Sequence, residues 1–95
     1  MNKENIIGLL IRSKQRRKIL LYLLSGKKSL VEIKNYLCIK SSFLMIQLKL
    51  LLKKKIIFEN KSYYELTKYG FLLVNEMNNI LLYIETIESQ YNYWS

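Results

Sequence analysis

The fold is decided by residues 29–66, whose sequence is SLVEIKNYLCIKSSFLMIQLKLLLKKKIIFENKSYYEL. The pattern S-x-x-E at residues 29–32 is a capping box, which predicts the start of a short helix. After a turn at residues 38–40, a serine is expected to cap a second helix that spans about residues 41–54, where apolar residues recur at helical spacing. The residues expected to face the core are Leu30, Ile33, Leu37, Leu44, Leu48, Leu51 and Leu52.

The period of the apolar residues then changes from helical to alternating. Segments 56–59 and 62–66 alternate as strands do, and residues 60–61 between them predict a hairpin turn. In this interpretation Ile56 and Phe58 share one face of the hairpin. A helix, a tight turn, a second helix and a hairpin in direct succession are the plan of a winged helix-turn-helix.

Helices are also expected on both sides of this unit. Residues 5–11 form a short apolar stretch with helical character, and Ser13 can cap a helix over residues 14–24. Thr67 can begin a long last helix that reaches about residue 91. The expected fold class is therefore mainly α with a small β-hairpin (α+β), a winged helix-turn-helix with a long C-terminal helix.

Charge divides the chain into two regions. The 95 residues carry 16 lysines and arginines against 7 acidic residues, a net charge of +9. Residues 1–68 hold all 16 cations and four glutamates, a net +12, whereas residues 69–95 hold three glutamates, a net −3. The codon bias of an AT-rich gene also raises lysine counts, but it does not explain why lysine stops at residue 68. We expect a DNA-binding domain over residues 1–68 and a C-terminal dimerisation or connector helix over residues 69–95.

The residues that the chain lacks exclude several kinds of site. It has no histidine, no aspartate, one cysteine and three glycines. A Ser-His-Asp triad, a thiolate cluster, a histidine-ligated metal site and a glycine-rich phosphate loop cannot be built from it. We expect no enzyme, no metal and no cofactor, and we expect Cys38 to be a small buried side chain. The apolar runs 6–11 and 19–24 are too short to span a bilayer, so no membrane association and a cytoplasmic location are expected.

The second helix, residues 41–54, is expected to enter the major groove, and the wing, residues 56–66, to lie on the DNA backbone. The residues just before the first helix of the helix-turn-helix, which begins near residue 30, are also expected to contact DNA, because a helix N-terminus binds phosphate. The expected DNA-contacting residues are Lys28, Ser29, Lys40, Ser41, Ser42, Met45, Ile46, Lys49 and Lys61.

These residues offer different kinds of contact. The serines and Lys49 can donate hydrogen bonds to bases or phosphates, and Lys61 at the wing tip can reach a phosphate. Met45 and Ile46 can make only apolar contact, for example with thymine methyl groups, or they can belong to the core or to a protein-binding surface. Gln47 is the one candidate for a bidentate contact with a base, so modest base specificity is expected.

The last helix carries apolar residues spaced 4, 3, 4, 3 and 4. This spacing is an a/d seam nearly three heptads long, which favours a coiled-coil-like homodimer. Packing against the chain's own first helix, around Ile7, Leu10 and Ile11, is the alternative and is expected near the start of the seam. The expected dimer interface consists of Leu73, Met77, Ile80, Ile84, Ile87 and Tyr91.

Residues 30–70 resemble the winged helix-turn-helix of ArsR-like archaeal transcription regulators, in which a strand ending Y-x-L-T-x-x-G, here residues 64–70, joins the wing to the next helix. The opening SKQRRKILLYLLSGKKS (13–29) and the closing YNYW (91–94) are similar to methanogen-type regulators whose winged helix precedes a ligand-sensing domain. The resemblance implies transcriptional regulation by a DNA-binding half without its ligand-sensing domain.

Three positions depart from the pattern of that family. Cys38 stands in the turn where glycine or asparagine is usual, and Lys55 stands where a glycine usually precedes the wing. Lys40 stands at the usual serine or threonine cap, so Ser41 is expected to take over the capping. Metal sensing of the ArsR type needs clustered cysteine and histidine, and it does not carry over to this chain.

Two classes of function remain open. The first is a homodimeric regulator that binds double-stranded DNA. The alternative is a winged-helix protein–protein interaction module within a larger assembly, which the apolar Met45 and Ile46 favour. An RNA-binding basic domain is a weaker third possibility, because the aromatic residues do not fall on an obvious open sheet.

Overall fold

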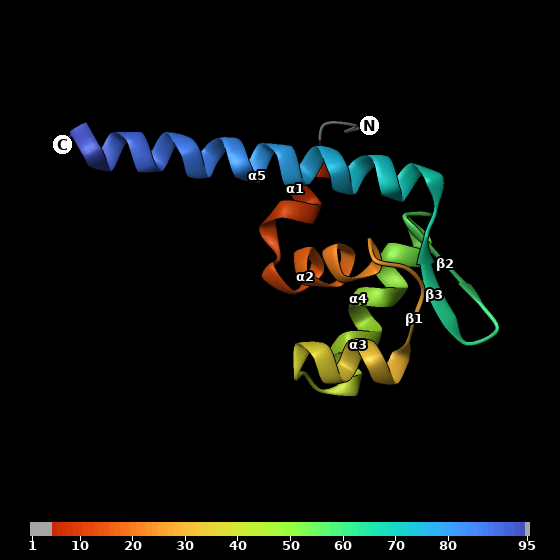
Figure 1. Cartoon of the computed structure of the whole chain (residues 1–95). Coiled ribbons are helices and arrows are strands. Elements are labelled where there is room, and N and C mark those ends of the chain that lie inside the picture. The colour runs from red at the N-terminus through yellow and green to blue at the C-terminus, as the bar shows by residue number, and fades with distance from the viewer. Residues whose placement is uncertain (1–4, 95) are drawn as a thin grey trace.

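The computed structural model describes residues 5–94, and its elements follow the predicted order with one additional strand. Helix α5 lies along one side of a body formed by the other elements, and its C-terminal part projects beyond that body (Figure 1). The extents of 51 × 33 × 22 Å reflect this projecting helix. The elements are α1 (Asn5–Arg12), α2 (Lys14–Leu23), β1 (Lys28–Ser29), α3 (Leu30–Leu37), α4 (Ser41–Lys53), β2 (Ile57–Asn60), β3 (Tyr63–Leu66) and α5 (Lys68–Trp94).

Side-chain caps begin α2 and α3 as the sequence predicts. The hydroxyl of Ser13 accepts a hydrogen bond from the backbone N–H of Arg16 at 3.2 Å. At α3 both halves of the capping box are formed. The N–H of Glu32 donates to Ser29 Oγ at 3.1 Å, and the N–H of Ser29 donates to the Glu32 carboxylate at 2.8 Å.

Helix α4 begins without a side-chain cap, so the predicted serine cap was wrong. Its N-cap residue is Lys40, whose side chain makes no capping hydrogen bond. An ammonium group has no acceptor to offer the free backbone N–H groups of a first turn. Ser41 cannot replace it, because it is already the first helical residue.

Cys38 ends α3 and turns the chain toward α4. Its backbone is left-handed, with φ 56° and ψ 47°, which is the conformation that glycine or asparagine favours at this position. The side chain is exposed, and its Sγ donates to the carbonyl of Asn35 at 3.4 Å. The prediction of a buried Cys38 was therefore wrong, because the left-handed turn directs the residue outward.

Strand β1 is the element that the sequence analysis did not predict. It pairs antiparallel with β3, with Lys28 opposite Tyr64 and Ser29 opposite Tyr63. The wing is thus part of a three-stranded sheet with the order β1-β3-β2. Because β1 runs directly into α3, this pairing joins the start of the helix-turn-helix to the wing.

The hairpin turn lies one residue later than predicted. Lys61 and Ser62 have φ values of 51° and 71°, which a two-residue type I′ turn requires at both positions. The strand β2 begins at Ile57, so Ile56 precedes it and does not take part in the alternation of its faces. Within β2, Ile57 is 2% exposed and Phe58 is 40% exposed, whereas the prediction grouped Phe58 with the buried Ile56.

One apolar core joins all five helices to the sheet. Four predicted core residues, Ile33, Leu44, Leu48 and Leu51, are fully buried, and the other three predicted positions are partly buried against them. The core thus holds both helices of the helix-turn-helix in place. Its remaining buried members are Leu10, Ile19, Leu20, Leu23, Ile56, Ile57, Tyr64, Val74 and Met77.

The start of α5 is fixed against the strand before it. Thr67 Oγ1 accepts from the N–H of Gly70 and donates to the carbonyl of Lys55, both at 2.8 Å, so Thr67 caps the helix as predicted. A Cβ at Gly70 would lie 1.9 Å from the carbonyl oxygen of Ile56, so only glycine allows the helix this close to the backbone.

Candidate nucleic-acid interface

Helix α4 has a buried side and an exposed side. Exposed residues spaced 4, 3 and 4 apart lie on one line along a helix. We define this outer face of α4 as Ser42, Ile46, Lys49 and Lys53, all of them exposed. It combines a hydroxyl, an apolar side chain and two ammonium groups. Lys40 and Ser41 are also exposed at the start of the helix, whereas Met45 is half-buried and packs against the core.

Gln47 is not on this face. It is 7% exposed, and its Oε1 accepts a hydrogen bond from Arg16 Nε at 2.9 Å. Arg16 also donates to the carbonyl of Leu9 at the end of α1, so one guanidinium links α1, α2 and α4. The sequence analysis missed this bridge, although Gln47 stands three residues after the buried Leu44, within the apolar stripe of the helix.

Lys28 and Ser29 already have partners within the chain. Lys28 Nζ donates to Ser25 Oγ at 2.8 Å and lies 4.7 Å from the centre of the Tyr22 ring. The hydroxyl of Ser29 is used in the capping box of α3. These two predicted contact residues therefore support the local structure at β1.

The wing carries charge of both signs. Lys61 is exposed in the turn, while Glu59 and Glu65 lie on the two strands. Burial raises the pKa of Tyr64, and the charge of Glu59, which is opposite it in the strand register, raises it further. Just before β1, Lys27 Nζ lies 4.9 Å from the centre of the Tyr63 ring. Positive charge on the hairpin is thus concentrated at its tip.

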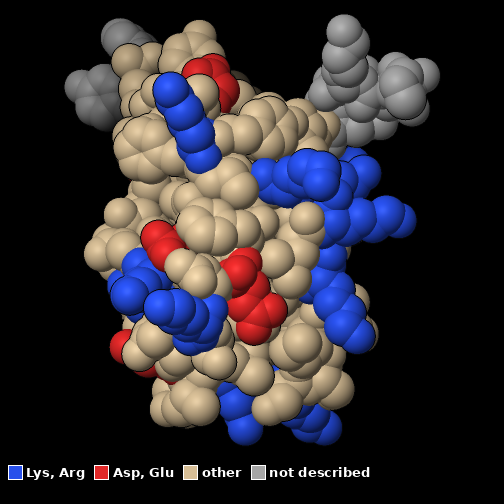
Figure 2. Space-filling view, turned by 90° about the vertical axis from the view of Figure 1, so that its right-hand side faces the viewer, with Lys and Arg blue, Asp and Glu red and all other residues tan. Residues whose placement is uncertain are grey.

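The view from the hairpin side shows lysine and arginine side chains in several separate groups, at the right, the left and the bottom of this face (Figure 2). Glutamate side chains lie beside the group on the left, near the centre and at the top. This face is therefore of mixed charge and attracts a polyanion only through its basic groups.

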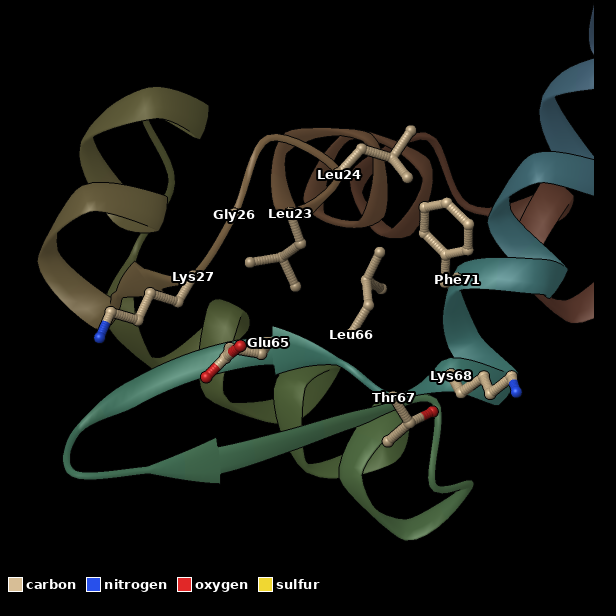
Figure 3. Close-up of a pocket in the computed structure, with 9 residues that line it drawn as sticks. All are labelled: Leu23, Leu24, Gly26, Lys27, Glu65, Leu66, Thr67, Lys68 and Phe71. Atoms are coloured by element: carbon tan, nitrogen blue, oxygen red, sulfur yellow. The ribbon is translucent and has the colours of Figure 1, made fainter.

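A hollow of about 360 Å³ lies between the end of α2, strand β3 and the start of α5 (Figure 3). Leu23, Leu24, Leu66 and Phe71 point toward its centre.

Within residues 5–94, no three cysteine or glutamate side chains gather to hold a metal ion. Among the same residues, no helix combines the length and apolar character that crossing a membrane requires.

The predicted seam on α5 divides into two parts. Leu73 packs against the core, and Met77 is fully buried there, so assigning Met77 to a dimer interface was wrong. Met77 is held by the chain's own helices. Ile80 is half-buried. Beyond it, Ile84, Ile87 and Tyr91 are 42%, 46% and 71% exposed, and we call these three residues the distal face of α5.

An exposed second helix in a helix-turn-helix, followed directly by a wing, defines the winged-helix class of proteins. The chain matches the family described as methanogenesis regulatory protein FilR1, N-terminal domain, over residues 4–85. Because the match covers most of its length, the chain belongs to this family. The predicted class of winged-helix transcription regulator is thereby confirmed, and the proteins of this family are regulators rather than enzymes.

Several solved structures share the fold. The quinone-bound YodB from B. subtilis has a TM-score of 0.80 at 22% identity, covering 90% of this chain and 98% of that chain. Ligand-free NadR has a TM-score of 0.67 at 21% identity, covering 90% and 64%. The adhesin competence repressor AdcR from Streptococcus pyogenes has a TM-score of 0.69 at 17% identity, covering 99% and 78%. Comparison with curated protein sequences gave no match.

Proposed function

We propose that this chain regulates transcription by binding double-stranded DNA, with α4 in the major groove and the wing tip on the phosphate backbone. The observation that carries the proposal is the outer face of α4, on which Ser42, Lys49 and Lys53 are exposed. The major groove admits one helix, and lysines neutralise phosphates on either side of it. Membership of a regulatory family supports the same function.

The exposed residues divide into two roles. Ser41 and Ser42 lie at the N-terminal end of α4, the end that approaches base edges in helix-turn-helix proteins, and their hydroxyls can donate or accept hydrogen bonds there. Lys40, Lys49 and Lys61 contact phosphates, and these contacts position the protein without selecting a sequence.

We further propose that the protein works as a homodimer through the distal face of α5. The distal face is an exposed apolar stripe, and burying it against another apolar surface is favourable. In a symmetric dimer, the distal face of the second copy provides that surface. A helix of 27 residues is about 40 Å long, comparable to the distance of about 34 Å between successive major grooves. ArsR-like character, which the sequence resemblance implies, and a cytoplasmic location, where a DNA-binding regulator acts, belong to the same proposal.

A salt titration tests DNA binding directly. Polarisation of a labelled duplex should report binding whose affinity falls steeply with salt. A dimer that makes roughly six phosphate contacts gives a log–log slope near −5. Failure to bind duplex DNA even at about 50 mM salt, where such contacts are strong, would contradict the proposal.

Failure to bind duplex DNA at low salt would favour the second candidate function, a protein-interaction module. The observation behind this alternative is the apolar surface of α4, where Phe43 is 41% exposed and Ile46 is 63% exposed. A module of this kind would use α4 to bind a protein rather than DNA.

A further inference from the structure

The exposed surface of α4 lacks most of the side chains that usually distinguish bases. Bidentate contacts to guanine come from arginine or lysine, and those to adenine come from asparagine or glutamine. The three arginines of the chain all lie before residue 18, and α4 contains no asparagine. Its one amide, Gln47, is buried and hydrogen-bonded to Arg16. Bidentate recognition of adenine by α4 is therefore excluded, and recognition of guanine depends on its lysines alone.

What α4 presents instead is an apolar side chain at the middle of its outer face. Ile46 is 63% exposed and lies about one turn from both Ser42 and Lys49. The apolar feature that base pairs present in the major groove is the C5 methyl group of thymine. The lysines on the same face match the phosphates on either side of the groove, so DNA fits this surface by charge as well as by shape.

We propose that Ile46 selects thymine by packing against its C5 methyl group, so that this chain prefers A·T-rich sites in DNA. The inference rests on the proposed function, since it requires α4 to lie in the major groove. Met45 does not share this role, because it is half-buried and packs against the core.

Replacing thymine with uracil removes this methyl group and keeps the Watson–Crick hydrogen bonds. The full chain is titrated with alternating duplexes of deoxyadenosine with thymidine and of deoxyadenosine with deoxyuridine. We expect the uracil duplex to bind about fourfold more weakly for each methyl group that is contacted. In the converse experiment, 5-methylcytosine places the same methyl group in a G·C duplex and should strengthen binding by a similar factor.

The variant Ile46→Ala tests the residue, because alanine is a good helix former at an exposed site. It should bind the thymine and uracil duplexes with equal affinity. Lys61→Ala is the matched control, and it should bind both duplexes more weakly while keeping the preference for thymine.

The outcomes separate the two proposals. Equal binding of both duplexes by the wild type, or a preference that Ile46→Ala retains, would overturn the role of Ile46 and leave DNA binding intact. A wild type that binds none of these duplexes at low salt would overturn DNA binding together with the inference.

Discussion

The outer face of α4 and the distal face of α5 both expose apolar side chains, but they differ in the charge that surrounds them. Both expose large apolar side chains, with Ile46 at 63% on α4 and Tyr91 at 71% on α5. On α4 the apolar residue stands beside Lys49 and Lys53. On α5 no lysine or arginine follows Lys68.

This difference indicates which partner each surface fits. An apolar patch marks an interaction site without specifying the partner. Lysines around the patch favour a polyanion, whereas an uncharged or weakly acidic surround favours an apolar surface such as the same helix of a second copy. The charge around each patch is therefore consistent with the two proposed roles, DNA binding for α4 and dimerisation for α5, and the following predictions test this contrast.

The largest effect is expected where α5 joins the body. Gly70→Ala places a Cβ against the Ile56 carbonyl, so α5 must shift or the core must open, and we expect a loss of about 3 kcal/mol or more. Urea denaturation measures it. Gly8→Ala is the matched control, because its Cβ would meet only the flexible end of Arg12 at 3.8 Å. This control should be neutral or slightly stabilising. Equal stability of Gly70→Ala and wild type would show that α5 does not approach the strand this closely.

The second prediction concerns the distal face. The double variant Ile84→Glu with Ile87→Glu places four carboxylates in a symmetric interface, so the protein should become monomeric. Binding to a two-half-site duplex should weaken by about 100-fold, because linkage of the two sites is lost. Sedimentation and polarisation measure the two effects.

Leu82→Glu with Thr86→Glu is the control for this pair. It adds the same charge on the opposite side of α5, where both residues are exposed. This variant should remain dimeric. A monomeric wild type at tens of micromolar, or a dimer that survives the first double variant, would remove the distal face from the interface.

The third prediction concerns the wing tip. Lys61→Ala should weaken binding to all duplexes by a similar factor and reduce the log–log salt slope by about 0.9. Lys14→Ala removes the same charge at the start of α2, beside α1, and should leave the slope nearly unchanged. If the two variants alter the slope equally, the wing tip makes no specific phosphate contact.

The smallest effect is expected at high pH. Because burial raises the pKa of Tyr64, the unfolded chain releases this proton at a lower pH than the folded chain does. The folded state then holds more protons, so stability falls as the pH rises through the ordinary tyrosine pKa of about 10. The free energy of unfolding is measured for the wild type and for Tyr64→Phe at about pH 9 and about pH 10.5. Because both proteins carry the same lysines, the difference between them separates this effect from lysine titration. The wild type should lose more stability than the variant between the two values.

Much of the fold was predictable because its signals are local. The capping box at Ser29, the cap at Thr67 and the spacing of leucines along α4 each act within one or two helical turns. Strand β1 has only two residues, which is too short for a period, and it forms because Tyr63 and Tyr64 lie opposite it. The turn was displaced by one residue because neither Lys61 nor Ser62 is a glycine, which usually marks a type I′ turn.

The candidate site was predicted less completely, because its composition depends on contacts distant in sequence. The sequence places Gln47 within α4 but does not indicate that Arg16, 31 residues earlier, turns the amide inward. It shows the a/d spacing of Met77 but not that the core closes around this residue. Local periodicity identifies the helix, and tertiary packing decides which of its residues are exposed.

The turn of the wing has a consequence for protein engineering. Lys61 and Ser62 both hold the left-handed conformation, which disfavours ordinary residues by roughly 1–2 kcal/mol each, and Asn-Gly is the sequence that such a turn prefers. A screen for thermal stability would therefore select Asn-Gly at these two positions. The resulting protein would melt at a higher temperature and would lack the ammonium group at the wing tip. Residue 61 therefore cannot be optimised for thermal stability and for affinity to a polyanion at the same time.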